Sequence, residues 1–261
     1  MKQRDSYLER VAKNIRELEA YSGPHLDCKV RLDGNESPFA LTQDIAEDVE
    51  AALRNVEVNR YPDPEALKLR TIIAGSSGLP TECILLGNGS DELIGMLVTA
   101  FTGSSGKVMY PTPTFSMFRI TALAMGKGVV EVPLDERFDI ELAATIDAVE
   151  KDDPDLIFLA SPNNPTGNKF SSEKIEEIIK RSGGIVVVDE AYSDFSGFTF
   201  MPLLSEYSNL VILRTLSKVG YAGLRLGILY ASKQLAREIN KVRYPYNINS
   251  LTQAAAEIVL K

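Results

Sequence analysis

The sequence predicts an α/β protein with a mostly parallel, seven-stranded sheet flanked by helices. From about residue 65 onward, short apolar runs rich in Val, Ile and Leu alternate with helical patterns. Apolar runs of this kind are typical of strands buried on both faces, and strand–helix alternation is typical of parallel sheets. Three loops that follow such runs carry chemically versatile side chains, and a parallel sheet gathers such loops at one edge.

Hydrophobic periodicity justifies each element in order. The first helix is indicated by Leu8, Val11, Ile15 and Leu18, which repeat with a helical period. We expect helices over residues 2–20, 43–54, 65–75, 91–101, 115–125, 139–150 and 172–181, and a last one from residue 250. Val- and Ile-rich runs predict sheet strands at 83–86, 107–110, 128–132, 156–160, 185–189, 210–214 and 226–230. A separate short strand is expected at 29–32.

Length and charge narrow the class of protein. A chain of 261 residues is long enough for one large domain and part of another. A formal charge of −8 argues against a broad nucleic-acid surface, although it leaves a local anion site possible. No apolar run approaches the roughly 18 residues that suggest a membrane span. The N-terminus has mixed charge and no apolar signal-peptide core. We expect a soluble, cytoplasmic protein with no membrane or nucleic-acid partner.

Cysteine and histidine usage excludes several kinds of site. Cys28 and Cys83 are far apart and lack metal-ligand spacing, so free, buried thiols are expected and no metal site. His25 is the only histidine, which makes a multi-histidine metal site impossible. A Ser-His-Asp triad would need this one residue, which lies in a predicted loop, to be well oriented. Acid–base chemistry is therefore expected from other residue types.

A glycine-rich loop joins a predicted strand to a predicted helix at Gly87–Ser90. Glycines let the backbone approach a ligand, and the N–H groups at the start of a helix attract phosphate. The alternative is a simple helix cap formed by Ser90, with Asp91 and Glu92 complementing the helix dipole. Taken alone, the loop fits the capping alternative better.

Two further loops carry an amide and an acid. Asn164 lies in a loop bracketed by prolines after a buried strand, where it either aims its amide at a ligand or forms an Asn-Pro turn. Asp189 ends the most apolar strand, and a carboxylate there must be paired. Its partner would be a helix N-terminus, an arginine or a cationic ring nitrogen of a ligand. Tyr192 is close enough in sequence to reach the same ligand.

Lys218 follows Ser217 after another buried strand, and Arg225 lies seven residues further on. The alternative here is a solvated surface lysine with a surface ion pair. A desolvated lysine with cationic neighbours, however, loses basicity and becomes a nucleophile toward carbonyl groups. Ser217 and Arg225 could bind the same phosphate as the glycine loop.

Together these side chains specify a ligand with an aldehyde, a basic ring nitrogen, a ring oxygen and a phosphate. Lys218 suits the aldehyde, Asp189 the nitrogen, and Asn164 with Tyr192 the oxygen. Pyridoxal 5′-phosphate (PLP) has all four groups. Phe115 would supply an aromatic ring to stack on its face.

These motifs resemble those of the fold-type I, class-II PLP-dependent aminotransferases, most closely the histidinol-phosphate aminotransferase group. The matching stretches run in family order from about residue 20 to the last residue. They are RLDGNESPF, RYPDPEALKLR, LLGNGSDELI, PTPTFSMFR, SPNNPTG, VVVDEAY, RTLSKVGYAGLRLG and PYNINSLTQAAA. The resemblance implies transfer of an amino group between L-histidinol phosphate and 2-oxoglutarate, in histidine biosynthesis.

The resemblance also assigns roles to individual residues. Lys218 would bond to the cofactor aldehyde and then carry the proton between the substrate Cα and cofactor C4′. Asp189 would keep the ring nitrogen protonated, Asn164 and Tyr192 would bind the ring oxygen, and Phe115 would stack where many relatives have Tyr. Phosphate contacts would come from Gly89, Ser90, Asp91, Ser217 and Arg225. Tyr61 would reach the phosphate of a partner subunit in a homodimer. Tyr21, Asn35 and Glu36 would line the substrate pocket.

The same resemblance implies the domain organisation. Residues 1–60 would form an N-terminal arm and part of a small domain, 61–248 the large PLP-binding domain, and 249–261 the start of an interdomain helix. The rest of the small domain, with the arginine that grips the substrate, would lie beyond residue 261, so activity of this chain is in doubt. The alternatives are another amino-acid aminotransferase, a threonine-phosphate decarboxylase-like enzyme, or an inactive PLP-binding fragment.

Overall fold

A computed structural model describes residues 7–20, 27–30 and 32–261. Within them, the strands are β1 (Ile84–Asn88), β2 (Lys107–Thr112), β3 (Gly128–Pro133), β4 (Leu156–Ala160), β5 (Ile185–Asp189), β6 (Leu210–Thr215) and β7 (Leu226–Ala231). The α-helices are α1 (Lys13–Arg16), α2 (Gln43–Arg54), α3 (Leu67–Ser77), α4 (Ser90–Phe101), α5 (Met117–Ala124), α6 (Leu142–Asp152), α7 (Ser172–Arg181), α8 (Ser193–Ser196), α9 (Lys233–Asn240) and α10 (Ser250–Val259). Short 3₁₀ turns lie at Leu8–Arg10, Thr81–Cys83, Met201–Ser205 and Ala222–Leu224, and a π-type turn at Ser217–Tyr221.

The strands form one sheet in the order β1-β7-β6-β5-β4-β2-β3. Neighbouring strands are parallel from β6 through β5, β4 and β2 to β3, whereas β7 is antiparallel to both β6 and β1. The predicted α/β class and mostly parallel, seven-stranded sheet are confirmed. Because β7 alone runs the other way, it begins at the edge where the remaining strands end, and its first residues join the loops gathered there.

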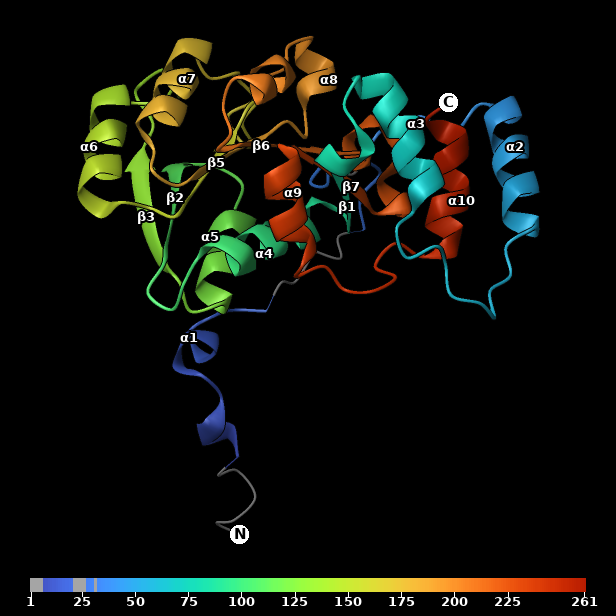
Figure 1. The fold of residues 1–261 in the computed structure, drawn as a ribbon, viewed down its shortest axis with the longest axis horizontal. Helices are drawn as coiled ribbons and strands as arrows, with labels where there is room; N and C mark the ends of the chain where they lie inside the picture. The colour runs from blue at the N-terminus through green and yellow to red at the C-terminus, as the bar shows by residue number, and fades with distance from the viewer. Residues whose placement is uncertain (1–6, 21–26, 31) are drawn as a thin grey trace.

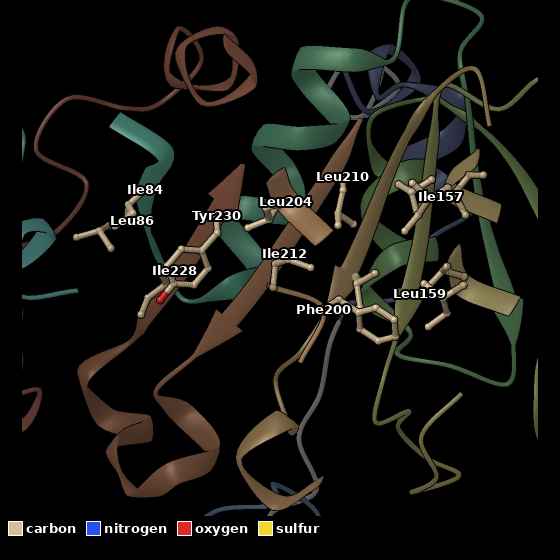
Figure 2. Close-up of a cluster of buried hydrophobic side chains, with 14 of the residues drawn as sticks. Ile84, Leu86, Ile157, Leu159, Phe200, Leu204, Leu210, Ile212, Ile228 and Tyr230 are labelled. Carbon is tan, nitrogen blue, oxygen red and sulfur yellow. The ribbon is translucent and has the colours of Figure 1, made fainter. Parts of the chain in front are cut away.

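Side chains alternate between two hydrophobic clusters, one on each face of the sheet. On β4, Ile157 and Leu159 belong to one cluster, and Leu156, Phe158 and Ala160 to the other. Figure 2 shows part of the first cluster, in which Ile157 and Leu159 lie near Ile212 and Phe200. Burial on both faces explains why these strands read as continuous apolar runs rather than as alternating ones.

Helices cover both faces of the sheet. Apolar residues of α3, α6, α7 and α10 belong to the first cluster, and those of α4, α5 and α9 belong to the second. Figure 1 shows the layers, with α6, α7 and α8 above the sheet, α4, α5 and α9 below it, and α2 beside α10 at one end. Among the described residues, no helix is long and apolar enough to cross a membrane.

Two expectations for the N-terminal region are wrong. The expected helix over 2–20 is present in its described part only as the turn Leu8–Arg10 and the single-turn α1. Its apolar side chains find little to pack against, since Leu8 and Ile15 stay exposed, and an amphipathic helix depends on such burial. The expected strand at 29–32 is also absent from its described residues, where Val30 and Leu32 are exposed and join no sheet edge.

The two thiols are free, as predicted, but the prediction that both are buried is wrong. Cys28 is exposed in the N-terminal region, and Cys83 is only partly covered at the start of β1. Burial nevertheless raises the pKa of the Cys83 thiol, with a further contribution from the neighbouring carboxylate of Glu82. Neither cysteine contributes to the pocket described next.

Candidate active site

A pocket of about 250 Å³ opens at the edge of the sheet where the parallel strands end. It receives side chains from the turns after β1, β4, β5 and β6, from the start of β7 and from the segment near residue 34. Its lining residues are Asp33, Gly34, Asn35, Ser90, Asp91, Phe115, Ala160, Pro162, Asn164, Asp189, Ala191, Tyr192, Thr215, Ser217, Lys218 and Arg225. The structure therefore brings together most of the residues predicted to bind a cofactor.

Asp189 provides a buried carboxylate in the pocket. It is only 4% exposed, and among the described residues its one hydrogen-bond donor is the Ala191 N–H, at 3.0 Å. Burial raises the pKa of Asp189 to about 6, and the charges of Asp91 and Glu190 act in the same direction. Of the partners considered from sequence, neither a helix N-terminus nor an arginine pairs with it in the part of the chain that the structure describes. This carboxylate is suited to a cationic group of a ligand.

Lys218 is half-buried in the turn after β6, at the same edge of the sheet as Asp189. Its Nζ donates a hydrogen bond to the Gly34 carbonyl oxygen at 2.8 Å and lies 5.9 Å from the centroid of the Tyr192 ring. Burial lowers the pKa of the Lys218 ammonium, and the charge of Arg225 lowers it further, while the carboxylate of Glu36 opposes both. A lysine whose ammonium form is disfavoured in this way is suited to attack a carbonyl group.

The turn between β1 and α4 forms the end of the pocket that was expected to bind phosphate. Gly89 has a positive φ of 78°, and its N–H donates to the Arg225 carbonyl oxygen at 2.7 Å. A Cβ at Gly89 would lie 2.5 Å from the Arg225 guanidinium, so a side chain there would displace the arginine. The expected alternative, a Ser90 cap, does not occur, because Gly89 is the N-cap and no side chain caps the helix. The first N–H groups of α4 therefore have no side-chain partner at the cap.

Arg225 connects this turn to the Lys218 loop. Its guanidinium donates to Asp91 Oδ2 at 3.1 Å and to Ser217 Oγ at 3.5 Å. Ser217 Oγ also accepts a hydrogen bond from Thr215 Oγ1 at 2.9 Å. The arrangement places one cation and two hydroxyl groups beside a helix N-terminus, which is suited to an anion.

Asn164, Tyr192 and Phe115 surround the remaining part of the pocket. Among the described residues, the Asn164 amide has no hydrogen-bond partner. Tyr192 OH accepts a hydrogen bond from Asn35 Nδ2 at 3.0 Å, which places the predicted substrate residue Asn35 over the same pocket. Phe115 packs edge-on against Phe118, with ring centroids 5.6 Å apart.

Two predicted residues lie outside this pocket, and a third is not among the described residues. Tyr61 is outside the pocket of its own chain, highly exposed, and stacks on Tyr246 with ring centroids 4.5 Å apart. Glu36 lines an adjoining groove of about 980 Å³, which shares Asn35, Asn164, Tyr192 and Lys218 with the pocket. Tyr21 lies outside the described residues.

Asn163 is a positioning residue that the sequence did not single out. Its buried amide donates to the Pro113 carbonyl oxygen at 3.0 Å and to Thr166 Oγ1 at 2.8 Å, and accepts from Thr114 Oγ1 at 2.7 Å. These bonds tie the loop that carries Phe115 to the loop that carries Asn164. Thr215, whose hydroxyl donates a hydrogen bond to Ser217, was also not singled out from the sequence. Both residues stand in motifs that the sequence displays, next to residues that were chosen.

We expect Asn163→Ala to destabilise the protein by about 1–3 kcal/mol, because it leaves buried hydrogen-bonding groups without partners. Urea unfolding of the cofactor-free protein measures the loss. Asn55→Ala is the matched control, since the Asn55 amide makes one exposed bond, to Ala51, and its loss should change stability by less than about 0.5 kcal/mol. Equal stability of the two variants would contradict the assignment of Asn163.

The donor set of the pocket fits the cofactor expected from the sequence. Asp189 is a buried acid without a cationic partner among the described residues, Lys218 is a lysine of lowered pKa, and Gly89 with Arg225 forms an anion cradle that a Cβ would fill. Together they complement the ring nitrogen, aldehyde and phosphate of PLP. The fit rests on the chemistry of residues from three separate places in the chain, namely the turn after β1, the end of β5 and the connection between β6 and β7.

Comparisons with known proteins agree with this fit. The family model for aminotransferase class I and II matches residues 28–261. Histidinol-phosphate aminotransferase 2 of Nitrosococcus oceani is 43% identical over 99% of this chain and 72% of its own length. The Aquifex aeolicus histidinol-phosphate aminotransferase is 44% identical over 96% of this chain and 70% of its own length. The structure is similar to that of histidinol-phosphate aminotransferase from Sinorhizobium meliloti in complex with pyridoxal-5′-phosphate, with a TM-score of 0.86 and 25% identity over 96% of this chain and 71% of that one. The chain therefore belongs to the aminotransferase class I and II family, with the fold-type I architecture that its motifs predict.

Proposed function

We propose that the protein is a PLP-dependent aminotransferase that transfers the amino group of L-histidinol phosphate to 2-oxoglutarate, as part of histidine biosynthesis. The convergence of Lys218 and Asp189 on one pocket supports the reaction type. Relatives named histidinol-phosphate aminotransferase, at 43% and 44% identity, support the amino donor. When bound, PLP supplies an electron-withdrawing ring that stabilises negative charge at the substrate Cα.

The chain's own residues would hold and move protons around that ring. Asp189 would accept a hydrogen bond from the ring N–H and keep that nitrogen protonated, since no cationic side chain among the described residues forms an ion pair with this buried acid. Lys218 would hold the aldehyde carbon and, once displaced by the amino donor, take the proton from the substrate Cα and return it to cofactor C4′. Asn164 and Tyr192 would orient the ring through its oxygen, and Phe115 would exclude water from one face.

The phosphate would lie between the start of α4 and Arg225. Ser90 and Asp91 would offer backbone N–H groups, and Ser217 and Arg225 would offer side-chain donors. Gly89, whose own N–H is bound to the Arg225 carbonyl oxygen, would contribute the space that a Cβ would fill. Asp91 would act mainly through its ion pair with Arg225, which orients the guanidinium. An anchored phosphate fixes the ring so that Lys218 and Asp189 meet opposite parts of it.

The substrate side of the proposal uses the groove beside the pocket. Asn35 and Glu36 would contact the amino donor, together with Tyr21. The proposal includes a homodimer, in which the exposed Tyr61 would reach the cofactor phosphate of the partner, and a cytoplasmic location, as expected of an enzyme of amino-acid biosynthesis. In the proposed domain organisation, residues 1–60 form the N-terminal arm and part of a small domain, 61–248 the large PLP-binding domain, and 249–261 the start of an interdomain helix. The chain spans about 70% of the length of its relatives.

The test compares amino donors on the purified chain loaded with PLP. Formation of glutamate from 2-oxoglutarate is followed with histidinol phosphate, phenylalanine and threonine phosphate as separate substrates, and carbon dioxide release is measured with the last. We expect the highest kcat/KM with histidinol phosphate. A preference for phenylalanine would assign another aminotransferase activity, and carbon dioxide release from threonine phosphate would assign a decarboxylase. A chain that fails to bind PLP would overturn the proposal.

A further inference from the structure

Two carboxylates stand next to each other at the end of β5. Asp189 enters the pocket, whereas Glu190 is the next residue and turns toward the opposite face of the sheet. Glu190 is 1% exposed, so both acids are removed from water. Burying two adjacent negative charges is unfavourable unless at least one of them is neutralised.

Glu190 is fully engaged on its own face. Its Oε2 accepts from Arg214 Nε at 3.0 Å and from Arg214 Nη2 at 2.8 Å. Its Oε1 accepts from the Phe200 N–H at 2.5 Å, and Thr199 Oγ1 lies within 3.0 Å of both oxygens. Arg214 also donates to Thr199 Oγ1 at 2.9 Å. A carboxylate bound twice by one guanidinium and by a backbone N–H is fixed in place.

The register of the sheet explains why this arginine reaches this glutamate. Asp189 pairs with Leu213 across the parallel strands β5 and β6, and the Glu190 N–H donates to the Leu213 carbonyl oxygen at 2.8 Å. Arg214 is the next residue on β6 and projects to the same face as Glu190. The ion pair therefore joins the ends of the two strands that carry Asp189 and Lys218, one residue away from the first and four from the second.

Neither residue lines the pocket, yet the charge of Glu190 acts on Asp189, and Arg214 is bound to Glu190. Asp189 is surrounded by the charges of Asp91 on α4, Glu190 on β5 and Lys218 after β6. Tyr230 on β7 feels the charges of Arg214, Glu190 and Asp194, so these groups also face the pair among the described residues. The charge of Glu190 raises the pKa of Asp189, and removal of the guanidinium that binds Glu190 would strengthen this effect. The pairing of Glu190 with Arg214 therefore limits the repulsion between the two adjacent carboxylates.

We propose that Arg214 and Glu190 are positioning residues for the transamination, because their ion pair compensates the charge next to Asp189 and ties together the ends of β5 and β6, the strands that lead to Asp189 and Lys218. This inference rests on the proposed function. It assigns Arg214 a role in cofactor electrostatics from the face of the sheet that the cofactor does not touch.

A double-mutant cycle tests the inference. Arg214→Met leaves Glu190 charged and unpaired, Glu190→Gln removes that charge, and the double variant contains neither charge. We expect Arg214→Met to weaken PLP binding about tenfold, measured by equilibrium dialysis, and the double variant to return to within about threefold of the wild type. Arg214→Lys keeps the charge and should rescue part of the loss. Arg181→Met removes an exposed arginine of α7 that pairs with Glu177 and Glu150, and should have no effect.

A spectroscopic readout separates positioning from simple loss of structure. The visible band of the bound cofactor changes with pH, and an uncompensated negative charge nearby moves the midpoint of that change upward. We expect the midpoint to rise in Arg214→Met and to return toward the wild-type value in the double variant. A double variant as impaired as Arg214→Met, or an unmoved midpoint, would overturn the inference alone. Failure of the wild-type chain to bind PLP would instead overturn the proposed function and this inference with it.

Discussion

Replacement of Lys218 by alanine is expected to abolish transamination, with a loss of at least about 10⁴-fold in kcat. General acid–base catalysis alone supplies up to about that factor, and the variant also loses the covalent attachment point. Among the described residues, Lys218 is the one lysine that lines the pocket, so no neighbouring lysine can replace it. Steady-state kinetics with histidinol phosphate measures the loss, and borohydride reduction followed by mass spectrometry measures attachment.

Lys241→Ala provides the matched control for Lys218→Ala. Lys241 lies directly after α9, where it pairs with Glu238 on the surface, so its loss should leave kinetics and attachment unchanged. In Lys218→Ala we expect PLP to be retained, if at all, only without a covalent bond. A borohydride-stable adduct on another lysine of this variant would contradict the assignment.

The second large effect is expected for Asp189→Asn, with a loss of about 10²–10³-fold in kcat. An asparagine still accepts the Ala191 N–H but cannot hold a proton on the ring nitrogen by charge, and such preorganised electrostatic contacts contribute about this factor. Asp194→Asn is the control, because Asp194 is an exposed acid on α8 outside the pocket. Kinetics of the two variants at the same pH compares them. A kcat for Asp189→Asn near the wild-type value would exclude the proposed role.

The same variant should change stability in a pH-dependent manner in the cofactor-free protein. The pKa of Asp189 is raised from 3.8 to about 6, so the folded protein holds this proton more tightly than the unfolded chain does. The stability associated with it is fully present below about pH 4 and is lost as pH rises through about 6. Two pH units correspond to about 3 kcal/mol. Asp189→Asn should therefore be more stable than wild type at pH 7 and nearly equal to it at pH 4, as measured by urea unfolding.

Patterns in the sequence predicted the central sheet because its strands are buried on both faces. Leu156–Ala160 is apolar throughout, and Ile185–Asp189 is apolar up to its final acid, so their boundaries coincide with the observed strands. Helix α9 was missed, although Ser232 caps it and Leu235, Ala236 and Ile239 have helical spacing. The predicted N-terminal helix was wrong for the opposite reason. Its apolar residues have helical periodicity, but Leu8 and Ile15 stay exposed instead of packing against the rest of the protein.

The sequence predicted only those pocket residues whose side-chain chemistry is distinctive on its own. Lys218, Asp189 and Asn164 were found because each has an unusual side chain directly after a buried strand. Asn163 and the Glu190–Arg214 pair act through hydrogen bonds between segments that are distant in sequence, and these depend on strand register. Thr215 acts locally, on Ser217, but its hydroxyl has no distinctive chemistry of its own. The position of Tyr61 outside its own pocket likewise depends on the path of the loop before α3.

The position of β7 between β6 and β1 also has a consequence for the order in which the protein assembles during synthesis. β1 is the first strand of the sheet to leave the ribosome, and its only sheet partner is the last one, separated from it by about half of the chain. The hydrogen-bonding edge of β1 therefore stays unpaired while the residues between β1 and β7 are synthesised, as a long-range contact of this kind closes late. Gly89 meets Arg225 only at that final step, which makes the anion cradle a marker of completed folding rather than of early collapse.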